Sequence, residues 1–274
     1  MKEQFKQVGI DTPSLDARLL LEYALGITRE QFILEKDLIL SGKQLKDISL
    51  VVKKRLGREP VSRILGEREF WSMPFALGKD TLDPRPDSET LIEQTLLKLG
   101  ERRLNLLRIL DLGTGTGCLL LSLLSELANS TGVGVDISKG AVEKAGLNAR
   151  NLNMSDRCQF INSSWGDMNV SEKFDIVISN PPYIPSEDIE CLEDEVKRFD
   201  PYCALSGGDD GLECYRQIAK LIPDLLADKG VLILEIGFNQ AEQVLKIFDL
   251  LELCTGEVFQ DLAGNDRCLI WQRK

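Results

Sequence analysis

Hydrophobic and polar residues follow a helical period through the first 58 residues of the chain. Between residues 45 and 56, apolar positions recur every three or four residues while Lys and Arg occupy the other face, which predicts an amphipathic helix. Two capping boxes, in which a Ser or Thr precedes a Gln by three residues, are predicted at Thr28–Gln31 and Ser41–Gln44. This region is therefore expected to form a small helical domain.

The pattern changes to short apolar runs from residue 105 onward. Segments with helical spacing separate these runs, and such alternation predicts parallel strands joined by right-handed crossovers. Near the end, Val258–Phe259 and Cys268–Trp271 flank the turn-forming residues 263–266, so the chain is expected to close with an antiparallel hairpin. The preceding strands are predicted at Leu107–Leu112, Val133–Asp136, Gln159–Asn162, Phe174–Ser179 and Val231–Ile236.

A segment rich in aromatic residues and proline connects the two patterns. Residues 70–77 are aromatic and β-prone, which predicts a short hairpin. In Pro84-Arg85-Pro86 both prolines favour extended backbone, and Arg85 is expected to project from the chain. Ser88 is expected to cap a helix that begins at Glu89. We therefore predict a helical domain at residues 1–65, a β-hairpin linker at 66–82 and an α/β domain at 83–274.

Composition excludes several classes of protein. The longest apolar runs, of about seven residues, are too short for a transmembrane helix, and the charged N-terminal residues predict no signal peptide. The chain has seven cysteines without a Cys-x-x-Cys pair, and it has no histidine. These counts argue against zinc sites of the Cys/His type, Ser-His-Asp catalysis and a histidine base. We expect a cytoplasmic monomer with no metal site and no membrane contact.

The net charge of −11 is unevenly distributed. Residues 1–80 hold 14 Lys and Arg against 12 Asp and Glu, whereas residues 81–274 hold 19 against 32. Binding to nucleic acid depends on neutralising phosphates with Lys and Arg, so a basic protein surface suits the acidic region better. Four basic residues of the first region form either a solvated helix face, which we favour, or a docking patch: Lys53, Lys54, Arg55 and Arg58.

A glycine-rich run, Asp111-Leu-Gly113-Thr-Gly115-Thr-Gly117, follows the strand predicted at Leu107–Leu112. Its glycines let the backbone turn tightly and approach a ligand at the carboxyl edge of the sheet. Asp136 ends the next strand, where a carboxylate can hold ribose hydroxyls, so the two features indicate a nucleoside cofactor. Asp111, placed to meet a cationic amino group, and the closing hairpin favour S-adenosyl-L-methionine over a nicotinamide nucleotide. Trp165 is either a surface for adenine or a core aromatic.

A second candidate site is Asn180-Pro181-Pro182-Tyr183, directly after the strand at residues 174–179. The prolines cannot donate ladder hydrogen bonds, so the strand must end there and the backbone must turn outward. An amide side chain, backbone carbonyls without sheet partners and an aromatic ring are suited to a flat substrate that bears an amide. Taken alone, the segment is equally consistent with an ordinary turn.

Taken together, these segments resemble the HemK/PrmC protein-glutamine N5-methyltransferases, which modify peptide chain release factors. Asn180–Tyr183 is shared with adenine-N6 and other amino-group methyltransferases and so indicates only the reaction class. The helical region and the Pro-Arg-Pro segment narrow the resemblance to this family. The residues that carry it are Glu59-Pro60, Gly66, Phe70-Trp71, Pro84-Arg85-Pro86 with Glu89, Asp111 to Gly117, Asn180 to Tyr183, Pro201, Ala204-Leu205, Gly207-Gly208, Asp210-Gly211-Leu212 and Tyr215-Arg216.

The resemblance implies a Rossmann-like class I S-adenosylmethionine-dependent methyltransferase. Its fold would be a seven-stranded, mostly parallel sheet that ends in an antiparallel hairpin, with a small N-terminal helical domain that docks the substrate. Its reaction would methylate the side-chain amide nitrogen (N5) of the glutamine in the GGQ motif of class 1 release factors, leaving S-adenosyl-L-homocysteine. The implied partners are release factors and not nucleic acid.

The resemblance also implies two sets of site residues. For the cofactor they are Asp111, Gly113, Thr114, Gly115, Thr116, Gly117, Asp136, Ser164, Trp165 and Asn180. For the substrate they are Arg85, Asn180, Pro181, Pro182 and Tyr183, of which Asn180, Pro181 and Tyr183 are expected to be catalytic. Two residues depart from the family. Ser164 replaces the usual acidic residue, so weaker bonding to the adenine amino group is expected, and Asp83 replaces a commonly apolar residue.

Our mechanistic hypothesis starts from the amide nitrogen, which is a poor nucleophile because its lone pair is delocalised. The Asn180 oxygen and the Pro181 carbonyl would accept its two N–H bonds, and these bonds would strengthen as positive charge develops on nitrogen. Tyr183 would pack against the amide and exclude water. Two alternatives stay open: an adenine-N6 methyltransferase acting on DNA or RNA, and a non-catalytic protein that binds S-adenosylmethionine, which only Ser164 favours.

Overall fold

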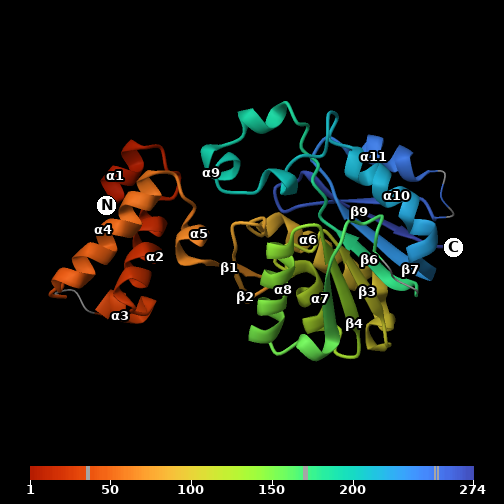
Figure 1. The fold of residues 1–274 in the computed structure, drawn as a ribbon, viewed down its shortest axis with the longest axis horizontal. Coiled ribbons are helices and arrows are strands. Elements are labelled where there is room, and N and C mark those ends of the chain that lie inside the picture. Colours follow the sequence, from red (N-terminus) through yellow and green to blue (C-terminus); the bar gives the residue numbers. More distant parts are fainter. Residues whose placement is uncertain (35–37, 169–171, 250, 252) are drawn as a thin grey trace. The chain divides into compact units, whose positions relative to one another are not determined.

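The protein divides into two compact units in the computed structural model, which describes residues 1–34, 38–168, 172–249, 251 and 253–274 (Figure 1). The helical unit comprises Met1–Glu67 together with Glu193–Phe199, and the sheet unit comprises Arg68–Leu192 together with Asp200–Lys274. The segment Glu193–Phe199 is thus a part of the helical unit that local sequence patterns did not indicate. Within the described residues, no helix is both long and apolar enough to span a membrane.

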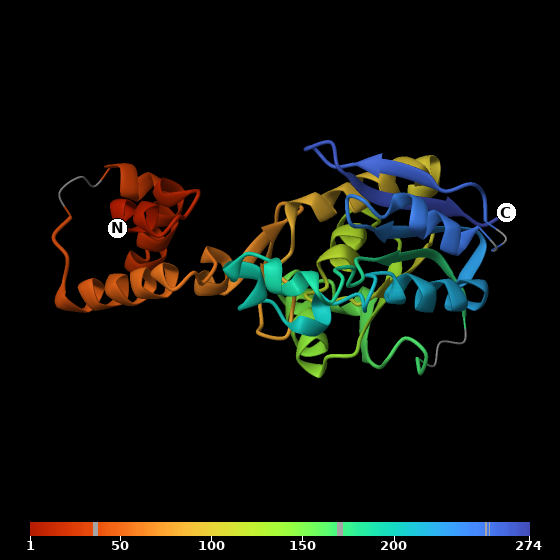
Figure 2. The same cartoon turned by 90° about the horizontal axis from the view of Figure 1, so that it is seen from above.

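Short helices around an apolar core build the helical unit, whose residues Met1–Glu67 are drawn in red and orange in Figure 2. Phe5, Leu20 and Val51 are buried in that core. Both predicted capping boxes form, because Ser41 and Gln44 exchange bonds and the N–H of Gln31 donates to Thr28. The helices are α1 Lys2–Gln7, α2 Pro13–Leu25, α3 Arg29–Leu34, α4 Gly42–Leu56, α5 Val61–Leu65 and α9 Asp194–Lys197.

Arg55 contradicts the favoured interpretation of the basic stretch as a solvated helix face. Its side chain is buried, and its Nε donates a 2.7 Å hydrogen bond to Oδ2 of Asp16, which is buried as well. Its Nη1 also lies 2.9 Å from Oε1 of Glu195. Arg58 pairs with the same Glu195 carboxylate at 3.2 Å. Part of the basic stretch is therefore an ion-paired element of the unit's interior.

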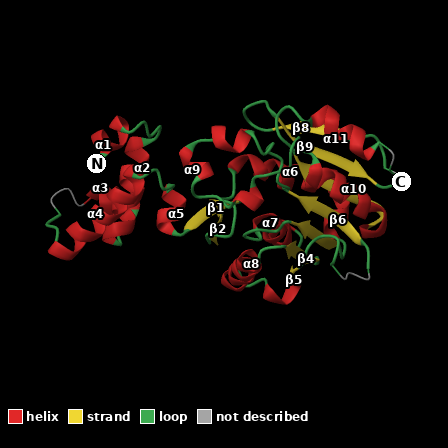
Figure 3. Cartoon of the chain, turned by 45° about the horizontal axis from the view of Figure 1, so that its top comes forward, coloured by secondary structure: helices red, strands yellow, loops and turns green. Residues whose placement is uncertain are grey.

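The sheet unit contains a seven-stranded sheet in the order β5-β4-β3-β6-β7-β9-β8 among the described residues (Figure 3). Neighbours from β5 to β7 pair in parallel, and β9 is antiparallel to both β7 and β8, as the closing hairpin predicts. The carboxyl ends of the parallel strands therefore share one edge, and strand order reverses between β3 and β6. The strands are β3 Arg108–Leu112, β4 Thr131–Asp136, β5 Cys158–Asn162, β6 Phe174–Ser179, β7 Leu226–Glu235, β8 Glu257–Gln260 and β9 Asp266–Gln272.

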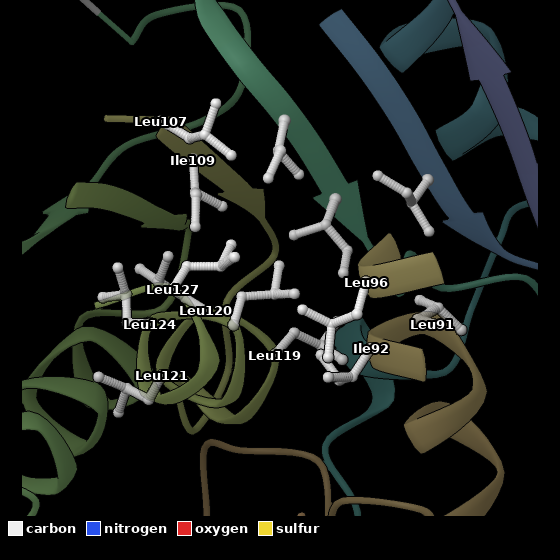
Figure 4. Close-up of a cluster of buried hydrophobic side chains, with 14 of the residues drawn as sticks. Leu91, Ile92, Leu96, Leu107, Ile109, Leu119, Leu120, Leu121, Leu124 and Leu127 are labelled. Atoms are coloured by element: carbon white, nitrogen blue, oxygen red, sulfur yellow. The ribbon is translucent and has the colours of Figure 1, made fainter. Parts of the chain in front are cut away.

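Helices cover both faces of this sheet because its central strands are apolar on both sides. Ile109 of β3 packs into one cluster with α6 and α7, shown in Figure 4, whereas its neighbour Leu110 packs into the opposite cluster with α10. Successive side chains of a strand point to opposite faces, which separates the two clusters. The helices are α6 Glu89–Leu99, α7 Cys118–Glu126, α8 Lys139–Asn151, α10 Glu213–Leu225 and α11 Ala241–Phe248, with 3₁₀ turns at Pro86–Ser88, Gly100–Leu104, Ser155–Arg157, Asp188–Cys191 and Tyr202–Ala204.

The predicted hairpin is a two-stranded sheet of β1 Glu67–Phe70 and β2 Met73–Ala76. Trp71 and Ser72 form its turn with φ of 49° and 57°, which matches the twist of the flanking strands. Ser88 precedes α6 as expected, but its side chain makes no capping hydrogen bond to that helix. The hydroxyl instead bonds across the molecule to Glu235, so the expected side-chain cap was wrong.

Candidate active site

A cavity of about 540 Å³ opens at the carboxyl edge of the sheet, inside the sheet unit. Among the described residues, Asp111, Gly117, Pro181 and Tyr183 are the predicted site residues that do not line it. The predicted residues that do line it are Arg85, Gly113, Thr114, Gly115, Thr116, Asp136, Ser164, Trp165, Asn180 and Pro182. The glycine-rich run and the Asn-Pro-Pro segment, 63 residues apart between Gly117 and Asn180, therefore border one cavity.

The glycine-rich run forms a tight loop between β3 and α7. Gly113, Gly115 and Gly117 have φ of 77°, 55° and 81°, a left-handed backbone that other residues adopt only with strain. The N–H groups of Gly113 and Thr114 both donate to the carbonyl of Val135, at 2.8 and 3.0 Å. The end of β4 thus holds the loop against the cavity.

Asp136 fastens the loop from the side of β4. Its Oδ2 accepts a 2.9 Å hydrogen bond from the N–H of Gly115, and its Oδ1 accepts one of the same length from the N–H of Ser138. Burial raises the pKa of this carboxyl above its ordinary value. Each oxygen keeps a further lone pair, so the carboxylate can also accept bonds from ligand hydroxyls.

Asp111 lies behind the loop and is fully buried. Its Oδ2 accepts a 2.7 Å hydrogen bond from the hydroxyl of Thr114, and burial raises its pKa to about 7. Its Oδ1 is buried without a side-chain hydrogen bond among the described residues. Thr116 lines the cavity, and its hydroxyl interacts with the thiol of Cys118.

Trp165 and Ser164 border the cavity after β5. A Cβ placed on Gly113 would lie 3.5 Å from Cζ2 of Trp165, so the indole packs close to the glycine loop. Ser164 donates a 2.6 Å hydrogen bond to Oδ2 of Asp167. Its oxygen therefore keeps lone pairs for accepting from a ligand, although it carries no charge.

Asn180 begins the loop that follows β6. The hydroxyl of Ser179 donates at 2.6 Å to the carbonyl of Leu112, which ties the end of β6 to the end of β3. Asn180 lines the cavity, whereas Pro181 is buried. The Tyr183 hydroxyl lies 3.4 Å from Oε1 of Glu235, and burial raises the pKa of Tyr183, so it remains a phenol.

The segment that ends at Gly207 packs against this loop so closely that residue 207 has no room for a side chain. The N–H of Ile184 donates to the carbonyl of Leu205 at 3.1 Å, and the N–H of Gly207 donates to the carbonyl of Ile184 at 2.9 Å. A Cβ on Gly207 would lie 2.8 Å from the carbonyl oxygen of Pro182. Backbone therefore packs directly against backbone here and holds Asn180–Tyr183 in place.

Arg85 lines the cavity as a member of an ion pair. Its Nη2 donates a 2.6 Å hydrogen bond to Oδ2 of Asp200, and Oδ1 of the same buried carboxylate accepts from the N–H of Asp83. Its side chain is 37% exposed. The ion pair therefore holds the guanidinium in position, and the exposed part can contact a ligand.

Two residues at the site, Ser88 and Glu235, were missed by reasoning from the sequence. Glu235 ends β7 fully buried, and burial raises its pKa to about 7. The hydroxyl of Ser88 donates to Oε2 of Glu235 at 2.5 Å and accepts from Nδ2 of Asn180 at 3.2 Å. A carboxylate that ends an apolar strand was the signal that singled out Asp136, and it applies equally to Glu235.

Known protein families match both units of the chain. Residues 1–66 match the PrmC N-terminal domain, and residues 105–258 match a methyltransferase domain. A methyltransferase from Pyrococcus furiosus shares the fold, with a TM-score of 0.55 and 16% identity over 84% of this chain and 98% of that one. The sheet order, the glycine loop and Asp136 fit S-adenosylmethionine, and together they define a class I methyltransferase that uses this cofactor.

Sequence relatives narrow this class further. A release factor glutamine methyltransferase of Rhodospirillum rubrum is 46% identical over 99% of this chain and 82% of its own length. One of Caulobacter vibrioides is 38% identical over 98% of this chain and 92% of its own length. The chain belongs to the family of release factor glutamine methyltransferases.

Proposed function

We infer that this chain transfers a methyl group from S-adenosyl-L-methionine to the side-chain amide nitrogen of a glutamine in peptide chain release factors. The target would be the glutamine of the GGQ motif of class 1 factors. The observation that carries this inference is that Asn180 lines the same cavity as Gly113 and Asp136. A side chain able to bind an amide thus borders the space that the glycine loop shapes for the cofactor.

The cofactor would be held by the loop from Gly113 to Gly117, by Asp136 at the ribose and by Trp165 along the adenine. When bound, it supplies a methyl group already activated on a sulfonium. The open acceptor sites of Asp136 support this assignment. Ser164 would accept a bond from the adenine amino group. Asp111 does not line the cavity, so we propose that it supports the loop through Thr114.

The substrate amide would be held by the loop after β6. The Asn180 oxygen and the Pro181 carbonyl would accept the two N–H bonds of the glutamine, which localises the nitrogen lone pair and stabilises positive charge as it develops. Tyr183 would cover the amide and exclude water. The chain's residues would thereby orient the nitrogen for attack, and a separate base is not required because the proton can leave after transfer.

The direct test offers methyl-labelled S-adenosylmethionine and purified chain to three acceptors. These are a class 1 release factor, the same factor with the target Gln replaced by Glu, and a mixture of DNA and ribosomal RNA. Label is expected only on the unaltered factor, and peptide mass spectrometry should place it on the GGQ glutamine. Label on nucleic acid would identify an adenine-N6 methyltransferase instead. Binding of cofactor without transfer to any acceptor would identify a non-catalytic binding protein.

We also propose that the helical unit docks the release factor. Several large apolar side chains are exposed on it, among them Leu45 and Leu50 of α4, and exposed apolar groups favour protein contacts. Replacing both by Ser should raise the KM for the release factor about tenfold or more without lowering kcat. The control replaces two exposed leucines of the sheet unit, Leu97 and Leu104, by Ser. Equal KM values for the two double variants would contradict docking by α4.

A further inference from the structure

The proposed reaction requires a particular orientation of the Asn180 amide. Its oxygen can accept an N–H of the substrate glutamine, whereas its nitrogen carries only donors and would oppose that N–H. The two ends of an Asn amide have nearly the same shape, so packing alone selects between them poorly. A hydrogen-bond partner on the far side of Asn180 is needed to select the orientation.

Two hydrogen bonds connect Asn180 to a buried carboxylate. Nδ2 of Asn180 lies 3.2 Å from Oγ of Ser88, and Oγ of Ser88 lies 2.5 Å from Oε2 of Glu235. Ser88 and Glu235 are only 3% and 1% exposed, so the bond between these two residues is shielded from bulk water. The three residues come from the start of α6, the end of β6 and the end of β7, all at the carboxyl edge of the sheet.

The chemistry of the serine hydroxyl sets the direction of this chain of bonds. A hydroxyl has one proton, and an ionised Glu235, which can only accept, directs the proton of Ser88 to its Oε2 at 2.5 Å. When Glu235 is ionised, Ser88 can therefore only accept from Asn180. The nitrogen of Asn180 must then face Ser88, and its oxygen must face the opposite way.

We propose that Ser88 and Glu235 are positioning residues that hold the Asn180 amide with its oxygen toward the substrate glutamine. The proposal rests on the function proposed above, in which that oxygen accepts from the substrate. Glu235 is itself fixed from other sides, since the carbonyl of the same residue accepts from the Tyr215 hydroxyl at 2.9 Å and its Oε1 faces the Tyr183 hydroxyl. The orientation of Asn180 is thus anchored to the centre of the sheet.

A double-mutant cycle tests whether Ser88 acts through Asn180. Ser88→Ala removes the acceptor, and we expect kcat with saturating release factor and cofactor to fall about 10- to 100-fold, as for loss of one buried bond. The KM for S-adenosylmethionine should change less than about threefold. In the Asn180→Ala background, Ser88→Ala should change kcat less than about twofold, because the group that it positions is gone.

Matched variants separate positioning from a general loss of structure. Ser122→Ala removes the hydroxyl of another fully buried serine, one without a partner among the described residues, and should leave kcat unchanged. Ser88→Thr keeps the hydroxyl and should recover most of the activity lost in Ser88→Ala. Glu235→Gln keeps an oxygen that can accept from Ser88, so its kcat should be about tenfold or more higher than that of Glu235→Met. In Glu235→Met the Ser88 hydroxyl has no acceptor there and can donate to the oxygen of Asn180 instead.

A spectroscopic measurement reads the orientation without any methyl transfer. The side-chain amide signal of Asn180 in a ¹H–¹⁵N spectrum, assigned by its loss in Asn180→Ala, should show one proton that exchanges slowly with water. That protection should disappear in Ser88→Ala and Glu235→Met and persist in Ser122→Ala. Unchanged protection in Ser88→Ala, or equal effects of Ser88→Ala with and without Asn180, would overturn the proposal. A protected amide in a wild-type chain that methylates no release factor would instead refute the proposed function.

Discussion

The backbone N–H of Gly115 donates a 2.9 Å hydrogen bond to Oδ2 of Asp136, which joins the glycine loop after β3 to the end of β4. Oδ1 of the same carboxylate accepts the N–H of Ser138. Asp136 therefore shapes the loop and also presents the charge expected to hold the ribose. The two tasks are inseparable, because both use the same pair of oxygens.

Asp136→Asn should weaken the binding of S-adenosylmethionine about tenfold or more. The Asn amide has one oxygen, so one of the two backbone N–H groups would face an NH₂ group, at a cost of about 1–3 kcal/mol. Isothermal titration calorimetry measures the change. Asp156→Asn, at an exposed position outside the cavity, is the control. Equal affinities of the two variants for S-adenosylmethionine would contradict a role of Asp136 in binding the cofactor.

Asn180→Ala should lower kcat about 10²- to 10³-fold, the loss seen when one group that stabilises a transition state is removed. The measurement is the initial rate of release factor methylation with both substrates saturating. Asn151→Ala, at an exposed position on α8, should behave as the unaltered chain does. Near-normal turnover of Asn180→Ala would contradict a catalytic role of this side chain.

Gly207→Ala should impair methylation by displacing the loop at Asn180–Tyr183. The added Cβ would lie 2.8 Å from each of three backbone atoms, on Pro182, Tyr183 and Gly211, and a rigid backbone cannot yield as a flexible side chain can. We expect a stability loss of about 1–3 kcal/mol and a fall in kcat. Gly42→Ala is the matched control, since no atom lies within 4 Å of its added Cβ. Full activity of Gly207→Ala would show that the loop tolerates displacement.

Asp16→Ala should destabilise the helical unit by about 3–5 kcal/mol, because it removes a close partner of the buried Arg55 guanidinium. Urea unfolding followed by circular dichroism measures this loss. The control is Glu22→Ala, which breaks the more exposed i,i+4 pair with Arg18 and should cost less than about 1 kcal/mol. Comparable losses of unfolding free energy in the two variants would mean that burial does not strengthen the ion pair between Arg55 and Asp16.

The pKa of Glu235 predicts a pH dependence of stability. Burial raises this pKa from an ordinary value of 4.5 to about 7 in the folded chain, so folding favours the protonated carboxyl. The contribution of Glu235 to the free energy of unfolding is therefore largest below pH 4.5 and is lost as the pH rises to about 7. The full shift corresponds to at most about 3 kcal/mol.

Glu235→Gln isolates this contribution, because Gln does not titrate and Asp111 is present in both chains. The unfolding free energy of the unaltered chain minus that of the variant should decrease between pH 5 and pH 7 and level off above pH 7. Urea titrations at four pH values measure it. A difference that stays constant, or that grows with pH, would contradict a raised pKa at Glu235.

Local patterns were sufficient to predict most of the fold and the main parts of the site. The runs at β3, β6 and β7 are apolar on both faces because the central strands of the sheet are buried on both faces, and that signal lies within each strand. The glycine loop could be recognised because positive φ favours glycine at those positions. The prolines at residues 181 and 182 stop β6 by chemistry that needs no distant partner.

Pairings between distant residues were decided only by the tertiary structure. Ser88 has the sequence context of a helix cap, yet its hydroxyl bonds to Glu235, 147 residues away, because both lie at one edge of the sheet. Arg55 has the pattern of an exposed helix face, yet it is buried against Asp16 and Glu195. Periodicity determines which residues form a strand, a helix or a turn, whereas the partner of a polar side chain depends on strand order and helix packing. The sequence alone therefore indicated Asn180 and the cofactor loop, and only the fold brought Ser88 and Glu235 to Asn180.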